Sequence, residues 1–262
     1  MSTKTVIQYA VGVTFALVVL TACTGDVNVG SPNSGGGGNW SWSSPPFIDK
    51  KNFSREVQVE NHMRMRLDAV NGELTITGQP DATSVMVSAE LRVGSHESWE
   101  DAETRLEQLE VLVTDLSDEI LVQTQQPDNT QGRQYVVDYT ITVPSNLEVD
   151  VNQVNGGIHV EDTANSVFVK AMNGSIDSTV SLPLHGEISL SMLNGDIDLR
   201  LPTSTSAELS AFVDNGSITW DNLNLPDAVH TTQSLTGTLG GGAGVIWLET
   251  TNGNIDVIGF DD

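Results

Sequence analysis

The chain has few side chains whose type and spacing could support catalysis or metal binding. Its five histidines are isolated in the sequence, and no pair has the spacing of zinc ligands: His62, His96, His159, His185 and His230. Residues 240–244 are rich in glycine, but Val245 and Ile246 follow them instead of the Lys and Ser or Thr of a phosphate-binding loop. A Gly-x-Ser-x-Gly nucleophile motif is absent from the sequence. We therefore expect no catalytic residues, no cofactor and no enzymatic activity.

One repeated acidic position has chemistry to consider. Asp177, Asp198 and Asp256 each lie four residues after an Asn that precedes a Gly. If these segments stack as neighbouring strands, the carboxylates of Asp177 and Asp198 lie about 5 Å apart. Such a pair repels unless a cation bridges it, and carboxylate oxygens suit calcium. The equivalent positions elsewhere hold Thr or His, so we expect a solvated acidic face and no metal site, with calcium at Asp177 and Asp198 as the lesser alternative.

The segments that carry these residues repeat along the chain. Six Asn-Gly pairs each have Ile or Leu two residues after the Gly. The pairs are Asn71-Gly72, Asn155-Gly156, Asn173-Gly174, Asn194-Gly195, Asn215-Gly216 and Asn252-Gly253. From Asn155 onward they are 18, 21, 21 and 37 residues apart, and a degenerate Thr236-Gly237 repeat fills the long interval. Because Asn and Gly tolerate positive φ, we interpret each pair as a structural turn.

Apolar residues alternate with polar ones on both sides of each turn, which predicts strands with one buried face. Three residues after each Asn, for example, the chain has Ile176, Ile197 or Ile218. The turns could close type I′ hairpins, or they could be corners of a solenoid whose rungs stack on one another. A shared period favours the solenoid. We therefore predict an all-β fold, a β-solenoid with rungs of about 18 to 21 residues stacked in sequence order.

The repeats divide the folded part of the chain into two sections of one continuous domain. Residues 147–262 form the regular array, and residues 53–146 form an irregular β section. In the latter we expect strands at residues 57–69, 73–78, 85–93, 110–114, 119–125 and 135–143. A helix is predicted over residues 98–110, because Ser98 can cap it and Ala102, Leu106 and Leu109 form one apolar stripe. This short helix should cap one end or side of the array.

The first residues direct the chain out of the cytoplasm. Residues 1–22 contain Lys4 and an apolar run over residues 10–20, too short to span a bilayer, which is typical of a signal peptide. Cys23, the only cysteine, follows Leu20-Thr21-Ala22 and resembles the lipobox of bacterial lipoproteins. The resemblance implies cleavage before Cys23 and its lipidation, whereas a secreted protein with a free cysteine is the alternative. Thr24 in place of Asp favours the outer membrane. Residues 23–52, rich in Gly, Ser, Asn and Pro, would form a flexible tether.

Longer runs of sequence resemble a known family. Residues 136–144 (Val-Val-Asp-Tyr-Thr-Ile-Thr-Val-Pro), then Leu147-Glu148-Val149, then repeated apolar-Asn-Gly-x-Ile units, resemble the bacterial β-strand-repeat family of candidate adhesins, a domain of unknown function. Residues 240–253 resemble the final repeat of that family. The resemblance covers residues 55–260. It implies a β-repeat protein of the cell envelope, often lipid-anchored, with no established enzymatic activity.

The charge of the chain restricts its partners. The net charge is −24, or −25 once residues 1–22 with their single Lys are removed. This excess of acid argues against nucleic acid and against direct attraction to anionic lipid. A lipid-anchored adhesin or interaction module that binds a polysaccharide or an envelope protein fits best. An envelope-stress sensor or regulatory lipoprotein is an alternative. A polysaccharide-acting β-helix enzyme is less favoured, since only Lys170 and Arg200 carry positive charge from Leu147 onward.

Overall fold

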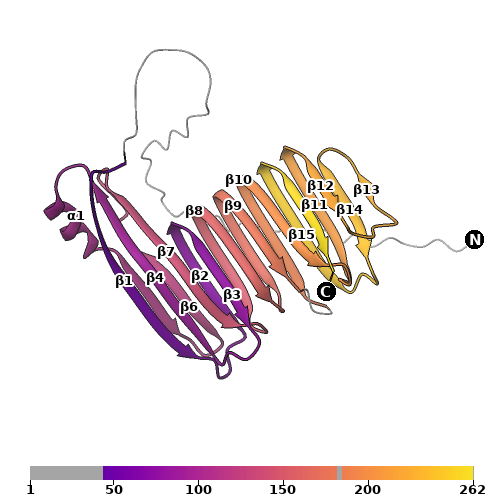
Figure 1. The fold of residues 1–262 in the computed structure, drawn as a ribbon, viewed down its shortest axis with the longest axis horizontal. Helices are drawn as coiled ribbons and strands as arrows, with labels where there is room; N and C mark the ends of the chain where they lie inside the picture. The colour runs from indigo at the N-terminus through magenta and orange to yellow at the C-terminus, as the bar shows by residue number, and fades with distance from the viewer. Residues whose placement is uncertain (1–43, 182–184, 262) are drawn as a thin grey trace, which may run out of the picture. The chain divides into compact units, whose positions relative to one another are not determined.

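The computed structural model describes residues 44–181 and 185–261. This part of the chain is all-β with one short helix, and its strands lie side by side in one continuously hydrogen-bonded sheet (Figure 1). In the repeats the sheet bends at each Asn-Gly pair. We call the strands before these pairs the leading face and the strands after them the trailing face.

Six rungs contain the Asn-Gly pairs. Three are long strands that run through the corner: β8 (Glu148–Thr163), β9 (Val167–Val180) and β10 (Glu187–Pro202). Three are divided at the corner: β2 (Arg64–Asn71) with β3 (Leu74–Gln79), β11 (Ala207–Asn215) with β12 (Ile218–Asp221), and β15 (Gly244–Asn252) with β16 (Ile255–Phe260). Neighbouring rungs pair in parallel with Asn opposite Asn. The array is therefore solenoid-like and not a series of hairpins.

The rungs do not stack wholly in sequence order, and that part of the prediction is wrong. Strand β15 pairs in parallel with β10 on one side and with β11 on the other. The last rung thus lies between two earlier ones, as Figure 1 shows for β10, β15 and β11. The outer side of β11 is already occupied by an antiparallel strand, so its inner side is the one that accepts β15.

That antiparallel strand, β14 (Ser234–Leu239), contains the expected degenerate repeat. Thr236-Gly237 is not a corner, which corrects the sequence interpretation. Gly237 lacks a positive φ, and Thr236 pairs with Ser210 of β11 in antiparallel register. A two-residue strand, β13 (Val229–His230), pairs with the other side of β14. Together these strands cover the edge of β11 that would otherwise be open.

The irregular section begins earlier than predicted. Strand β1 (Phe47–Gln58) starts six residues before Phe53, so residues 47–52 belong to the fold and not to a tether. Lys50 Nζ lies 3.0 Å from Glu90 Oε2, and the Phe47 ring contacts Trp99 edge-on at 5.7 Å between centroids. Because β1 is an edge strand with mostly exposed or half-exposed side chains, its apolar alternation is weak in the sequence.

The predicted strand over residues 57–69 is interrupted at residues 59–63, between β1 and β2. The other strands agree with prediction to within two residues at each end: β4 (Ser84–Ser95), β5 (Glu110–Asp115), β6 (Glu119–Gln125) and β7 (Gln134–Pro144).

These strands extend both faces of the array. Strands β1, β4 and β7 extend the trailing face through antiparallel pairs, and β7 joins β3 in parallel. Strands β6 and β5 extend the leading face beyond β2.

Helix α1 (Trp99–Leu106) is shorter than the predicted 98–110. Its first turn is capped as expected, since the Ser98 side chain accepts from the Asp101 N–H at 3.1 Å. The Gln108 and Leu109 N–H groups donate to carbonyls three residues back, which tightens the chain and ends the helix. Leu109 is still buried, but from this turn and not from the helix. The helix lies against β1 and β4, so it covers the outer part of the trailing face.

The two faces enclose one aliphatic interior. Ile176, Ile197 and Ile218 are buried as predicted, with at most 3% of each side chain exposed. On the leading face the equivalent column is formed by Val149, Val167, Ile188, Ile246 and Leu209, all buried. Each rung therefore adds one layer to the core, and burial of these side chains is the main favourable term for stacking.

The corner asparagines form a hydrogen-bonded ladder. Asn155, Asn173, Asn194, Asn252 and Asn215 each donate Nδ2 to Oδ1 of the Asn in the preceding rung, at 2.6 to 3.0 Å. At the start of the ladder, Asn71 donates to the Tyr135 carbonyl at 3.0 Å. All six amides point the same way, so each Asn within the column both donates and accepts. Parallel stacking in register is what allows this repeat of one interaction.

The glycine at each corner has no room for a side chain. A Cβ on Gly195 would lie 1.8 Å from the Gly174 carbonyl oxygen, and one on Gly174 would lie 2.0 Å from the Gly156 oxygen. All six corner glycines also have φ between 129° and 156°, which L side chains rarely adopt. Glycine is therefore required at each corner for two reasons. The backbone conformation there disfavours any side chain, and a side chain would collide with a neighbouring strand.

Substitution of one corner glycine should separate these two constraints. We expect Gly195→Ala to lower the free energy of unfolding by roughly 3 kcal/mol or more, because the new methyl group strains the backbone and forces two rungs apart. Gly132→Ala is the control, since Gly132 has φ +79° with nothing within 4 Å of an added Cβ, and it should cost only about 1 kcal/mol. Urea unfolding midpoints measure both. Equal losses in the two variants would contradict the contact argument.

Candidate functional site

The residues that could have formed a metal or catalytic centre are dispersed. Among the described residues, no group of three or more His, Cys, Asp or Glu side chains could hold a metal ion. His62 Nε2 pairs with Asp115 Oδ1 at 2.8 Å, and His159 Nδ1 lies 3.3 Å from Asp177 Oδ2. His185 contacts a backbone carbonyl, and His230 packs edge-on to Trp220. These contacts link neighbouring segments, and none of them joins two histidines.

The acidic position predicted from the repeats forms a row on the trailing face. The register places Asp177 beside Asp198 and Asp198 beside Asp256, with His159 and Thr219 at the two ends. Burial and the neighbouring carboxylate of Asp177 raise the pKa of Asp198 above its usual 3.8, and Asp256 adds to the effect. Thr219 donates its hydroxyl to Asp256. The row therefore places like charges opposite one another, and among the described residues it is not part of any group of three or more His, Cys, Asp or Glu side chains that could hold a metal ion.

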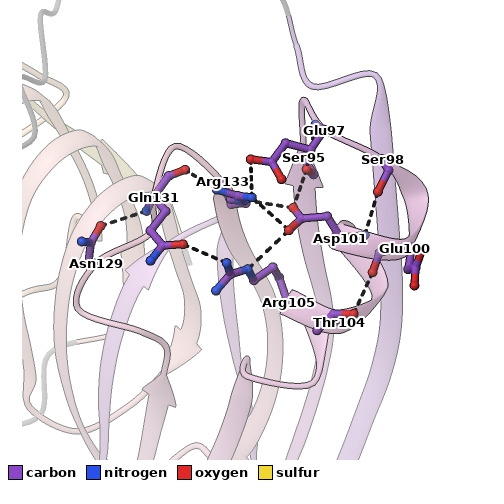
Figure 2. Close-up of polar contacts among 10 residues, drawn as sticks. All are labelled: Ser95, Glu97, Ser98, Glu100, Asp101, Thr104, Arg105, Asn129, Gln131 and Arg133. Atoms are coloured by element: carbon purple, nitrogen blue, oxygen red, sulfur yellow. Dashed lines mark hydrogen bonds and ion pairs between the residues drawn. The ribbon is translucent and has the colours of Figure 1, made fainter.

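A polar network surrounds α1 (Figure 2). Arg133 donates Nε and Nη2 to the two Asp101 oxygens, both at 2.9 Å, and also pairs with Glu97 at 2.6 Å. Ser95 donates to Asp101 at 2.6 Å. These bonds hold the pKa of Asp101 well below its usual range. Because every charged group at the centre is paired, the network fixes α1 against the segment before β7 and is not a reactive site.

The leading face carries exposed aromatic side chains, which we call the aromatic face: Phe168 of β9, Trp247 of β15 and Phe212 of β11. Trp247 is 41% exposed, and the other two rings are partly exposed. The Phe212 and Trp247 ring centroids lie 5.0 Å apart at an interplanar angle of 41°. Trp247 Nε1 donates to Glu249 Oε2 at 3.2 Å. Exposed aromatic groups with polar neighbours are typical of binding surfaces.

The aromatic face was not predicted from the sequence, although a signal for it exists. Phe168 and Trp247 both lie five residues before a corner Asn, at positions that the alternation assigns to the outside of a strand. Comparison of this offset among the repeats would have placed both rings in one row. Phe212 lies two residues further along its strand, in a row nearer the corner.

The twelve predicted turn residues lie at the corners described above, in the Asn ladder and the glycine contacts. Cys23 lies outside the described residues, so its lipidation stays a prediction. No helix in the part of the chain that the structure describes is long and apolar enough to cross a membrane.

Comparisons with known proteins agree with this architecture. Residues 136–258 match the model of a family described as Toastrack DUF4097, which supports the resemblance to an adhesin-like domain of unknown function. A solved structure from Clostridium sporogenes, provisionally described as a cell adhesion protein, is 13% identical with a TM-score of 0.58, covering 81% of this chain and 100% of its own. At this identity the likeness shows the fold alone.

A further solved structure, from Bacteroides fragilis, is provisionally described as an adhesin. It is 9% identical and covers 79% of this chain and 97% of its own, with a TM-score of 0.27, which is too low to indicate a shared fold. The chain matches no curated protein.

The acidic row predicts an unusual response to pH. Because the pKa of Asp198 is higher in the folded chain than in the unfolded one, its contribution favours folding below pH 3.8 and is lost as the pH rises through the raised value. We expect Asp198→Asn to raise the free energy of unfolding at pH 7 by about 0.5 to 1 kcal/mol, since like charges lie directly opposite one another there.

Asp227 provides a matched control, because its pKa is shifted in the opposite direction from that of Asp198. The Thr238 N–H and hydroxyl donate to it and lower its pKa, so Asp227→Asn should destabilise the protein at pH 7. Urea unfolding of both variants at pH 3.5 and pH 7 measures the effects. A loss of stability in Asp198→Asn at pH 7 would show that the carboxylate is stabilising in its row.

Proposed function

We propose that this protein is a lipid-anchored cell-envelope protein that uses its β-rung array as a non-catalytic interaction module of adhesin type. Acylation of Cys23 holds it at the membrane, and at the outer membrane in a Gram-negative cell. Support comes from the apolar run over residues 10–20, from the Leu-Thr-Ala-Cys sequence and from Thr24. A bilayer is thus one partner, through the lipid and not through the acidic array.

The observation that carries this proposal is the exposed aromatic face. Parallel rungs in strict register hold Trp247 and its neighbours on a rigid sheet, so their positions are fixed before any partner binds. Rigid aromatic groups contribute large contact area at low cost in conformational entropy. The partner is a polysaccharide or another envelope protein. The net charge of −24 argues against nucleic acid as a partner, because the two would repel one another.

The lipid anchor can be tested by replacing its attachment residue. Cys23→Ser should move the protein from the membrane fraction to the soluble fraction, because the acyl chains contribute about 0.8 kcal/mol per buried methylene group. Fractionation and the mass of the N-terminal peptide are the measurements. Thr24→Ser is the control and should remain acylated. Cys23→Ser protein that stays with the membrane would contradict lipid anchoring at this residue.

The interaction role can be tested in cells that lack the gene. We expect deletion to reduce attachment to a glycan- or protein-coated surface at least severalfold, and expression of the wild-type chain to restore it. Expression of Trp247→Ala should restore little attachment, because the aromatic face loses its largest ring, whereas Trp99→Ala should restore it fully. Envelope-stress reporter activity is measured in parallel. A changed reporter with unchanged attachment would instead support a sensor, and cleaved polysaccharide in the medium would support an enzyme.

A further inference from the structure

We infer that the aromatic face binds an extended polysaccharide that carries no acidic groups, with sugar rings stacked on Phe168 and Trp247. The inference rests on the proposed interaction role and adds the class of ligand and the residues that contact it. It follows from the spacing of the rings, the small side chains between them and the charges around them.

The spacing of the two rings suits a linear polymer. Phe168 and Trp247 lie in the same row across the strands, since Phe168 is opposite Ser189 and Ser189 is opposite Trp247. They are therefore two rungs apart, roughly 10 Å at the usual distance between paired strands. This distance is comparable with the length of a disaccharide unit in an extended polysaccharide, so every second sugar could stack on a ring.

Small side chains flank Trp247 within its own row, while Phe212 of the next row packs against the ring. Its neighbours in the row are Ser189 on β10 and Ser210 on β11. A serine side chain is too short to cover an indole ring, so the part of Trp247 that Phe212 does not cover remains exposed. The apolar face of a sugar ring can contact the indole there, and the two hydroxyl groups can hydrogen-bond to the sugar.

A carboxylate beside the ring adds polar recognition. Glu249 accepts from Trp247 Nε1 at 3.2 Å, which helps to fix the orientation of the indole. A carboxylate has two oxygens and about four acceptor positions, so Glu249 can also accept hydrogen bonds from sugar hydroxyls. Phe212 packs against Trp247 from the neighbouring rung and supports the ring from the side.

The charges nearby discriminate against acidic polymers. Glu187 and Glu208 lie in the adjoining row on either side of Val245, and Glu249 lies beside the ring. Lys170, two residues from Phe168, is the one cation on the leading-face parts of β9, β10, β15 and β11. A uronic acid polymer would therefore meet net repulsion here. Along this row the rings alternate with serines, so the row itself contains no continuous apolar strip of the kind found at the centre of protein interfaces.

Binding of defined oligosaccharides to the full-length acylated protein in detergent tests the inference. The probes are neutral β-1,4-linked hexasaccharides of glucose, of N-acetylglucosamine and of mannose, with an alginate hexasaccharide as the acidic comparison and poly-lysine as the basic peptide. Isothermal titration calorimetry is the measurement. We expect at least one neutral hexasaccharide to bind and alginate not to bind.

Variants then locate the site. Trp247→Ala should weaken the binding of the neutral hexasaccharide at least tenfold, and Trp99→Ala, which removes an exposed tryptophan from α1, should leave it unchanged. Phe168→Ala should weaken hexasaccharide binding severalfold while leaving disaccharide binding unchanged, since a disaccharide reaches only one ring. Ser210→Gln keeps every ring and fills the space beside Trp247, so it should also weaken binding; thermal melting checks that each variant is folded.

Three results would overturn the inference: no binding of any of the three neutral hexasaccharides, tighter binding of alginate, or binding of poly-lysine alone. Equal binding by wild-type, Trp247→Ala and Ser210→Gln would also overturn it, because the sugar would then lie elsewhere. If attachment of cells still depends on Trp247 while all three hexasaccharides fail, the interaction role stands and only the polysaccharide assignment falls.

Discussion

Contact between glycine backbones at successive corners is the constraint on which the rest of the array depends. The carbonyl oxygen of one corner glycine lies about where a Cβ on the glycine of the next rung would be. Only glycine at these positions therefore lets neighbouring rungs approach to hydrogen-bonding distance. With the corners fixed, the asparagine before each glycine is aligned with its counterparts, and the ladder of amide hydrogen bonds follows. The same alignment superimposes the aliphatic columns inside and the polar and aromatic rows outside.

Much of this architecture can be predicted from the sequence, because its causes are local. Period-two alternation sets which residues face inward, and positive φ at the glycines sets the corners, so burial of Ile176 and Ile197 could be anticipated. The order of the rungs could not. If two rungs exchanged places, Asn would still lie opposite Asn and aliphatic residues opposite aliphatic residues. The repeat pattern in the sequence therefore does not show that β15 is inserted between β10 and β11.

The candidate site shows the same division between local and non-local information. The pairing of Asp177 with Asp198 could be predicted, because the two share one offset in rungs that are consecutive in the sequence. The place of Asp256 beside Asp198 could not, since it depends on the inserted rung, and the neighbours of Trp247 depend on it in the same way. In sequence order Ser210 would follow Ser189 directly, and Trp247 would lie outside both instead of between them.

The inserted rung also has a consequence for how the chain acquires its structure. Strands β10 and β11 are separated in the sheet by residues 244–252, which follow both of them in the sequence and are therefore synthesised last. Until those residues emerge, two edges with unpaired backbone groups face each other across an empty slot, and they are free to associate wrongly with one another or with other chains. Completion of the interior thus waits for a late segment, so the array can close only after residues 244–252 have been synthesised.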